Sequence, residues 1–213
     1  MDKKELQNPA LYTNRELSWL LFNKRVLSEA RDKQLLLFER LKFLSITASN
    51  LDEFFMVRIG SLVDMIHAEY TKKDIAGMSA KEQLDALMEE THKFAALQYS
   101  TYNRMLLPQL RANGLNFVEH HEQLTERQAQ YVDEYFEENV YPVLTPMAVD
   151  SSRPFPLIRN KTLNIGALVA KKGEKDTEIE FATVQVPSVL PRVVRIPAAK
   201  EGDTEVAASG RDH

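Results

Sequence analysis

The chain has 213 residues, of which 44% are hydrophobic and 27% are charged, and its formal net charge is −4 at pH 7. Basic and acidic residues are interspersed, so no broad positive field favours nucleic acid or an anionic membrane as the main partner. The absence of cysteine excludes disulfides, thiolate chemistry and cysteine-based metal sites. Because no run of about eighteen apolar residues occurs and the N-terminus is polar, we expect no signal peptide, no membrane span and a cytoplasmic location.

The first predicted helix runs from about residue 14 to residue 30. Thr13 and Glu16 have the spacing of a capping box, in which Thr13 would be the N-cap. Apolar residues then recur at helical spacing, at Leu17, Leu20, Leu21, Val26 and Leu27. Trp19, the only tryptophan, is interpreted as a core anchor rather than as a stacking platform for a ligand, because large aromatic side chains dominate protein cores.

Two further amphipathic helices are predicted to meet at the polar stretch 45–50, with a break near Ser49 and a restart at Asn50. Asn50 and Glu53 have the form of a second capping box. An asparagine at an exposed helix N-terminus can contact a ligand, and the nearby Asp52 and Glu53 disfavour phosphate and favour a neutral group such as a base. The alternative is that Asn50 only caps the helix, since asparagine is a common N-cap.

A loop is predicted over residues 70–78, followed by a capping box at Ser79 that opens a long helix. Pro108 should kink or restart that helix, and Asn113 with Gly114 should end it. The predicted helices are sufficient for an antiparallel helical domain, which we assign to residues 1–119.

The histidines do not form a recognisable site. His120 and His121 are adjacent, so their side chains point in different directions, and no third ligand lies at a useful spacing. His67 and His92 lie on predicted helices without an activating carboxylate. We therefore expect surface histidines, and we assign no metal ligand and no catalytic residue to this chain.

The pattern changes in residues 120–213, which we assign to a partial second domain. A capping box at Thr125 opens a helix that Pro142 should end, and the proline-rich segments 141–146 and 153–157 are interpreted as stiff connectors. Alternating residues predict a β-hairpin over 163–186 with a loop of about six residues, and 193–196 predicts a short extended segment. Residues 198–213 are polar and without period, so we expect a disordered tail.

Several separate motifs, in order, carry a resemblance to one family. In the first half they are ELSWL at 16–20, residues 22–27, ERLKFL at 39–44, SNLDEF at 49–54 and VR at 57–58. In the second half they are YPVLTP at 141–146, FP at 155–156, NKTLN at 160–164 and VPSVLPR at 186–192. The chain thus resembles the amino-terminal domain and the start of the middle, or head, domain of the long-chain-synthesising bacterial polyphosphate kinases. The implied fold class is mainly α, an antiparallel helical domain followed by an incomplete α+β head domain that contains the hairpin.

The resemblance implies an ATP:polyphosphate phosphotransferase, which reversibly transfers the γ-phosphate of ATP through a phosphohistidine with Mg²⁺. Its implied partners are ATP or ADP and polyphosphate, with a homo-oligomer formed through the head domain. Only one ligand contact of the family corresponds to a residue of this sequence, Asn50, at the adenine end of ATP. The family's phosphohistidine, metal-binding arginines and tunnel residues have no counterpart up to His213, so the 213 residues alone are expected to fold but to be inactive.

A second hypothesis, of another class, is a non-catalytic helical interaction or dimerisation module. It rests on the long amphipathic helices and on the lack of a self-contained catalytic group. The downstream reading frame distinguishes the two hypotheses: histidine-bearing domains that resemble phospholipases favour the enzyme, and a native stop codon favours the module.

Overall fold

Helices build the first of the two compact units into which the chain divides, Met1–Asn113 and Gly114–His213. The structure is a computed structural model, and it describes residues 5–149, 155–170, 179–197 and 206–209. The predicted fold class, an antiparallel helical domain followed by an α+β domain, is confirmed. The predicted boundary after residue 119 would place strand β1 (Asn116–Val118) in the first domain, whereas the division after Asn113 places it in the second unit.

Helix α1 (Arg15–Arg31) begins at a different residue from the predicted one. Its N-cap is Asn14, whose Oδ1 accepts hydrogen bonds from the backbone N–H groups of Glu16 and Leu17. Asn14 is only 3% exposed, and its Nδ2 donates to Asp74 at 2.7 Å and to Gln83 at 2.9 Å. Thr13 is therefore not the cap: Asn14 accepts from the start of the helix through Oδ1 and donates two hydrogen bonds through Nδ2, whereas a threonine hydroxyl has only one hydrogen to donate.

Helix α2 (Leu37–Phe54) continues without interruption into the π-helical segment η3 (Phe55–Ile59) and then into α3 (Gly60–His67). The predicted break near Ser49 is wrong, and the irregularity lies at η3 instead. The polar stretch 45–50 does not end the helix, and the side chains of Thr47 and Asn50 make hydrogen bonds that leave the helical ladder intact. The hydroxyl of Thr47, for example, donates to the carbonyl oxygen of Leu44 at 2.7 Å.

Helix α4 (Ala80–Thr101) starts as predicted, since Ser79 and Glu82 form a complete capping box. It passes through the π-helical segment η4 (Tyr102–Leu106) into α5 (Leu107–Ala112), where Pro108 occupies the first turn. Proline is tolerated there because the first N–H groups of a helix need no intrahelical partner. Gly114 has a φ of +82°, the left-handed conformation that commonly terminates helices.

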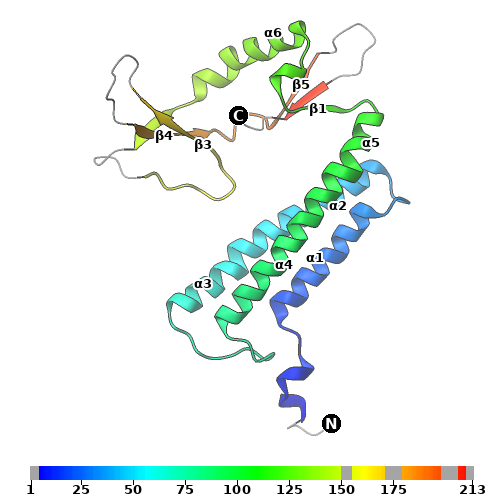
Figure 1. Ribbon diagram of the computed structural model, residues 1–213, viewed down its shortest axis with the longest axis vertical. Helices are drawn as coiled ribbons and strands as arrows, with labels where there is room; N and C mark the ends of the chain where they lie inside the picture. The colour runs from blue at the N-terminus through cyan, green and yellow to red at the C-terminus, as the bar shows by residue number, and fades with distance from the viewer. Residues whose placement is uncertain (1–4, 150–154, 171–178, 198–205, 210–213) are drawn as a thin grey trace. The chain divides into compact units, whose positions relative to one another are not determined.

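The helices of the first unit lie side by side (Figure 1). α1 and α2 are antiparallel, as shown by contacts from Glu16 to Arg58 near one end and from Ala30 to Arg40 near the other. Two clusters of buried side chains fill the space between α1, α2, α3 and α4, and they contain Leu20, Phe54, Ile59, Leu62, Ala80 and Leu87 in one, and Leu27, Ala30 and Phe94 in the other. Trp19 stacks on Phe54 with ring centroids 4.3 Å apart, which confirms its interpretation as a core residue.

The second unit begins with β1 and the helix α6 (Glu126–Tyr135), whose capping box at Thr125 is confirmed. A π-helical segment, η6 (Phe136–Val140), and a 3₁₀ turn, η7 (Tyr141–Val143), follow, so the helix ends at Pro142 as predicted. Gln128 also donates to the carbonyl oxygen of Pro197 at 3.2 Å, which ties α6 to the end of a strand.

One sheet of this unit has the order β2-β4-β3. The predicted hairpin is confirmed as β3 (Leu163–Val169) and β4 (Glu180–Val186), which are antiparallel. Its predicted loop of about six residues, 171–176, lies outside the described residues. β2 (Pro146–Val149) pairs with the other edge of β4, so the segment 141–146 is not only a connector and β4 is central. Proline fits at Pro146 because it is the first residue of an edge strand.

A second sheet has the order β1-β6-β5 and joins residues far apart in sequence. β5 (Val193–Ile196) confirms the predicted extended segment, and β6 (Val206–Ser209) is antiparallel to it and parallel to β1. The expectation of a disordered tail over 198–213 is therefore wrong for 206–209, because backbone pairing with two strands orders a segment that lacks a pattern of its own. The rest of that tail, 198–205 and 210–213, lies outside the described residues.

Candidate functional site

Asn50 lies inside α2, half-buried, and its side chain points to α1. Its Nδ2 donates to Oδ1 of Asn23 at 3.0 Å. Asn50 is therefore not an N-cap, and the predicted free N–H groups of a helix start are not beside it, since α2 runs unbroken from Leu37 to Phe54. One part of the prediction still applies: the side-chain amide of Asn50 is partly exposed, at the junction of two helices.

Asn23 is the buried partner that fixes this amide. It is 0% exposed, and its Nδ2 donates to the backbone carbonyl oxygen of Thr47 at 3.1 Å. A carbonyl oxygen can only accept, so the nitrogen of Asn23 faces Thr47. The oxygen of Asn23 accepts the hydrogen bond from Asn50, so the two contacts together hold the buried amide of Asn23.

Thr47 extends the polar contacts to a third helix. Its side chain is also 0% exposed, and its Oγ1 accepts a hydrogen bond from Nε2 of Gln98 on α4 at 2.9 Å. Asn23, Thr47, Asn50 and Gln98 form one chain of hydrogen bonds across α1, α2 and α4, which we call the amide chain. A buried polar chain of this kind holds its members in one geometry, because each unmade bond would leave a desolvated polar group.

The charges near Asn50 are negative. Asp52 and Glu53 are exposed, and Glu53, three residues after Asn50, lies on the neighbouring position of the same helix face. The carboxylate of Glu16, which is 7% exposed, is already paired with Arg15 and lies 3.9 Å from Arg58. The surface around the Asn50 amide therefore favours a neutral hydrogen-bonding group over a phosphate.

The described residues contain no cluster of three His, Asp or Glu side chains that could hold a metal ion. His67, His92, His120 and His121 are exposed, and Nε2 of His121 lies 3.2 Å from Asp133, a partner that the sequence analysis did not find. His213 is outside the described residues. In the described part of the chain, no helix is both long and apolar enough to cross a membrane.

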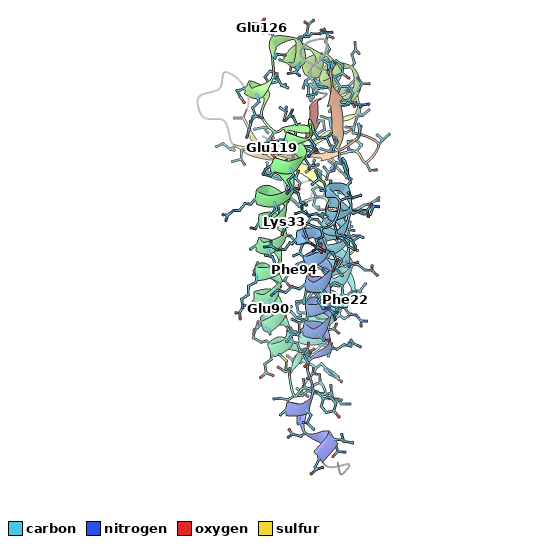
Figure 2. All side chains as sticks on the ribbon, turned by 90° about the vertical axis from the view of Figure 1, so that its right-hand side faces the viewer. Phe22, Lys33, Glu90, Phe94, Glu119 and Glu126 are labelled. Atoms are coloured by element: carbon cyan, nitrogen blue, oxygen red, sulfur yellow. The ribbon has the colours of Figure 1, made fainter. Side chains whose placement is uncertain are left out.

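A separate apolar groove of about 270 Å³ lies between α1 and α4. Its lining consists of Thr13, Leu17, Leu20, Leu21, Lys24, Glu90, Lys93 and Phe94. Figure 2 labels Glu90 and Phe94 on α4 and Phe22 on the adjacent α1. Hydrogen bonds to Glu89 and Glu90 raise the pKa of Lys93, and these two carboxylates offset its positive charge at this edge of the groove. The amide chain does not line the groove, and the two features are distinct.

The sequence matches two protein-family models. The family model described as "Polyphosphate kinase N-terminal domain" matches residues 12–118, and the one described as "Polyphosphate kinase middle domain" matches residues 127–209. The chain belongs to the polyphosphate kinase family. The matched segments include the amide chain in the first unit and most of the strands of the second.

Individual polyphosphate kinases resemble the chain over most of its length. The protein of that name from Lactiplantibacillus plantarum is 53% identical over 188 residues, which are 88% of this chain and 26% of the relative. The polyphosphate kinase of Halalkalibacterium halodurans is 47% identical over 194 residues, 91% of this chain and 27% of the relative. The chain thus spans about a quarter of the length of these relatives.

A solved structure agrees with this membership. The crystal structure of polyphosphate kinase from Porphyromonas gingivalis matches with a TM-score of 0.77 and 29% identity, and the match covers 92% of this chain and 28% of that chain. The chain therefore shares the fold of the corresponding part of this polyphosphate kinase.

The sequence predicted Asn50 as a candidate ligand residue but did not indicate the residues that its side chain contacts. One signal was available. Asn23 occupies a position between Leu20 and Leu27 in the stripe that α1 buries, and a polar residue in a buried stripe calls for a hydrogen-bonding partner. The identity of that partner could not be inferred, because Thr47 and Asn50 lie on another helix.

Proposed function

We propose that this chain is the amino-terminal and middle part of an ATP:polyphosphate phosphotransferase, which reversibly transfers the γ-phosphate of ATP to polyphosphate through a phosphohistidine. The observation that carries the proposal is the match of both family models, in order, over residues 12–118 and 127–209. In this proposal the first unit covers the nucleotide and the second contributes to a homo-oligomer, and the complete protein is cytoplasmic. Mg²⁺ and the phosphohistidine belong to the remaining three quarters of the family's length.

Within that function, Asn50 contacts the adenine end of ATP. Two features support this role. The amide of Asn50 is partly exposed while its orientation is held by Asn23, which gives a ligand a fixed hydrogen-bonding group. The exposed carboxylates of Asp52 and Glu53 repel phosphates, so a nucleotide would approach this surface with its base and not with its phosphates.

The test uses a chimeric kinase, in which residues 12–209 of this chain replace the matching segment of the 53% identical relative from Lactiplantibacillus plantarum. We expect the chimera to form polyphosphate from ATP and Mg²⁺. Asn50→Ala should raise its KM for ATP roughly fivefold, the equivalent of about 1 kcal/mol for one lost hydrogen bond. An inactive chimera would contradict the proposed function, whereas an unchanged KM in an active chimera would contradict only the role of Asn50.

Asn50→Asp should have a larger effect on the protein than the sequence suggested. As an N-cap, Asn50 could be replaced by Asp without loss of stability, but Asn50 does not cap a helix. The carboxylate would face Oδ1 of Asn23 without a proton to donate, so we expect both a raised KM and a lowered thermal stability.

The isolated 213 residues should bind no metal in a catalytic geometry and should transfer no phosphate. Phosphoryl transfer needs positioned cations around the reacting phosphate. Incorporation of labelled phosphate by the chain alone would contradict this expectation.

A further inference from the structure

The apolar groove between α1 and α4 is an open face of the helical unit. We propose that a second copy of the chain covers it, so that α1 of each copy packs on α4 of the other and Lys24 pairs with Glu90 across the interface. This surface lies in the first unit, so it is separate from the proposed contact of Asn50 with the nucleotide and from the homo-oligomer proposed for the second unit.

α1 and α4 are parallel neighbours along their length. Asn14, the N-cap of α1, donates to Gln83 in the first turn of α4. Arg31 at the end of α1 donates to Thr101 at the end of α4. α2 packs on α1 and α3 packs on α4, but every residue that lines the groove belongs to α1, to α4 or to Thr13 just before α1. The helix pair is therefore covered on one side by α2 and α3 and open along the groove.

The open face is apolar and has the size of a small interface. Leu20 and Phe94 are buried at its floor, whereas Leu21 is 57% exposed. α1 has 17 residues and α4 has 22, and two helices of such lengths side by side present a face of about 500 Å². Two faces of this size would bury about 1,000 Å² in total, near the lower end for specific interfaces, so the dissociation constant should be roughly micromolar.

The charges of the two helices favour a second copy as the occupant. α1 carries four basic and two acidic residues, and α4 carries two basic and four acidic ones. On the α1 wall of the groove Lys24 is exposed, and it makes no ion pair with the residues that the structure describes. On the α4 wall Glu90 pairs with Lys93 through Oε1, so its other oxygen can accept a hydrogen bond from a further cation.

A two-fold axis in the plane of the interface can join the two faces in two ways while the helices stay aligned. An axis across the helices would place α1 on α1 and α4 on α4, so that helices with the same excess of charge would face each other. An axis along the helices places α1 of each copy on α4 of the other, where Lys24 of one copy meets Glu90 of the other. Opposite charges fix the register of an interface and like charges oppose it, so the second arrangement is favoured.

The test is the mass of the 213-residue chain in solution, measured by light scattering over a range of protein concentrations. Leu21→Glu places a charge on the apolar face and should halve the mass of the associated species, while any pairing through the second unit stays intact. Phe22→Glu is the matched control, because Phe22 is 55% exposed and Leu21 is 57% exposed, but Phe22 does not line the groove. Phe22→Glu should leave the association unchanged.

Exchanging charges tests the assigned pair. Each contact between Lys24 and Glu90 occurs twice in a two-fold dimer, so Lys24→Glu or Glu90→Lys alone should weaken association by about tenfold. The double variant should restore association, because it rebuilds both pairs with the charges reversed. In Glu90→Lys, Lys93 keeps its ion pair with Glu89. Helical circular dichroism checks that each variant folds, and if Leu21→Glu does not fold, the charge reversals and their rescue decide the question.

A chain that is monomeric at every concentration would overturn the proposal. An associated species that Leu21→Glu and the single charge reversals leave unchanged would also overturn it, and a double variant that stays dissociated would overturn the pairing of Lys24 with Glu90. If the 213-residue chain is monomeric and Leu21→Glu inactivates the chimeric kinase, the groove is covered by the rest of the kinase and not by a second copy.

Discussion

The helical unit and the sheet-containing unit bury their apolar residues to very different extents. Of the thirteen buried hydrophobic side chains among the described residues, twelve lie in Met1–Asn113 and one, Ile196, lies in Gly114–His213. In the second unit large apolar side chains such as Leu157, Leu168 and Val189 are at least 75% exposed. Helices bury a stripe against near neighbours in sequence, whereas each of these short strands depends on partners elsewhere in the chain. The first unit should therefore supply most of the stability.

The largest expected effect is a difference in amide hydrogen exchange. Exchange in α1, α2 and α4 should be slower by orders of magnitude than in β2, β3 and β4, because local opening is easiest where few apolar contacts resist it. Exchange measured by mass spectrometry on the intact chain checks this. Equal protection of the amide protons in both units would show that the number of buried apolar side chains does not predict the stability of the two units.

Cavity variants in each unit sharpen the comparison. Leu87 is 0% exposed in the helical core, so Leu87→Ala should destabilise the first unit by about 3 kcal/mol. Ile196 is equally buried, and Ile196→Ala should affect the second unit and leave the unfolding midpoint of the helices in place. Urea denaturation followed by the fluorescence of Trp19, the only tryptophan, reports on the first unit, and amide exchange in β3 and β4 reports on the second. A shift of the helical transition by Ile196→Ala would mean that the units unfold together.

Replacing a glycine by alanine should lower the stability in the second unit and raise it in the first. A Cβ at Gly166 on β3 would lie 3.0 Å from the ring of Phe181, which stacks on Phe155, so Gly166→Ala should cost about 1–3 kcal/mol. At Gly60 in α3 the nearest atom would be 3.8 Å away, and alanine is the better helix former, so Gly60→Ala should stabilise by up to about 1 kcal/mol. Thermal melting of the two variants side by side tests this pair.

The smallest expected effects are at the helix caps and should be alike in both units. Ser79→Ala and Thr125→Ala each remove one complete capping box and should cost about 1 kcal/mol. Thr13→Ala is the control, because Thr13 has the spacing of a cap but Asn14 does the capping. A loss of stability in Thr13→Ala as large as in Ser79→Ala would contradict this assignment.

Local patterns predicted the helical unit well where the deciding partners are close in sequence. The boxes at Ser79 and Thr125 are examples, since each cap bonds a residue three positions later. The same reasoning failed at Asn50, whose spacing to Glu53 is that of a box. Its amide instead bonds Asn23, which is 27 residues away, and no local pattern contains that information.

The strands of the two sheets also depend on partners that a local sequence pattern does not reveal. The hairpin of β3 and β4 was predictable because alternating residues lie on both sides of one short connection. β2 was hidden by its proline, and β6 by a composition without alternating bulky residues. The family assignment and the proposal that Asn50 contacts a ligand came from ordered motifs, but the contact between Asn50 and Asn23 depends on the packing of α1 on α2.

The parallel pairing of β1 with β6 also has a consequence for the order of folding during synthesis. Asn116 pairs with Val206, 90 positions later. Closing a loop of that length carries a chain-entropy cost of about 4 kcal/mol in its length-dependent part. At about 5–20 residues per second, a ribosome needs roughly 5–20 seconds to make the intervening segment. The helices of the first unit can complete their core in that time. Until β6 is made, the edge of β1 stays unpaired, and a chaperone or a second nascent chain could pair with it.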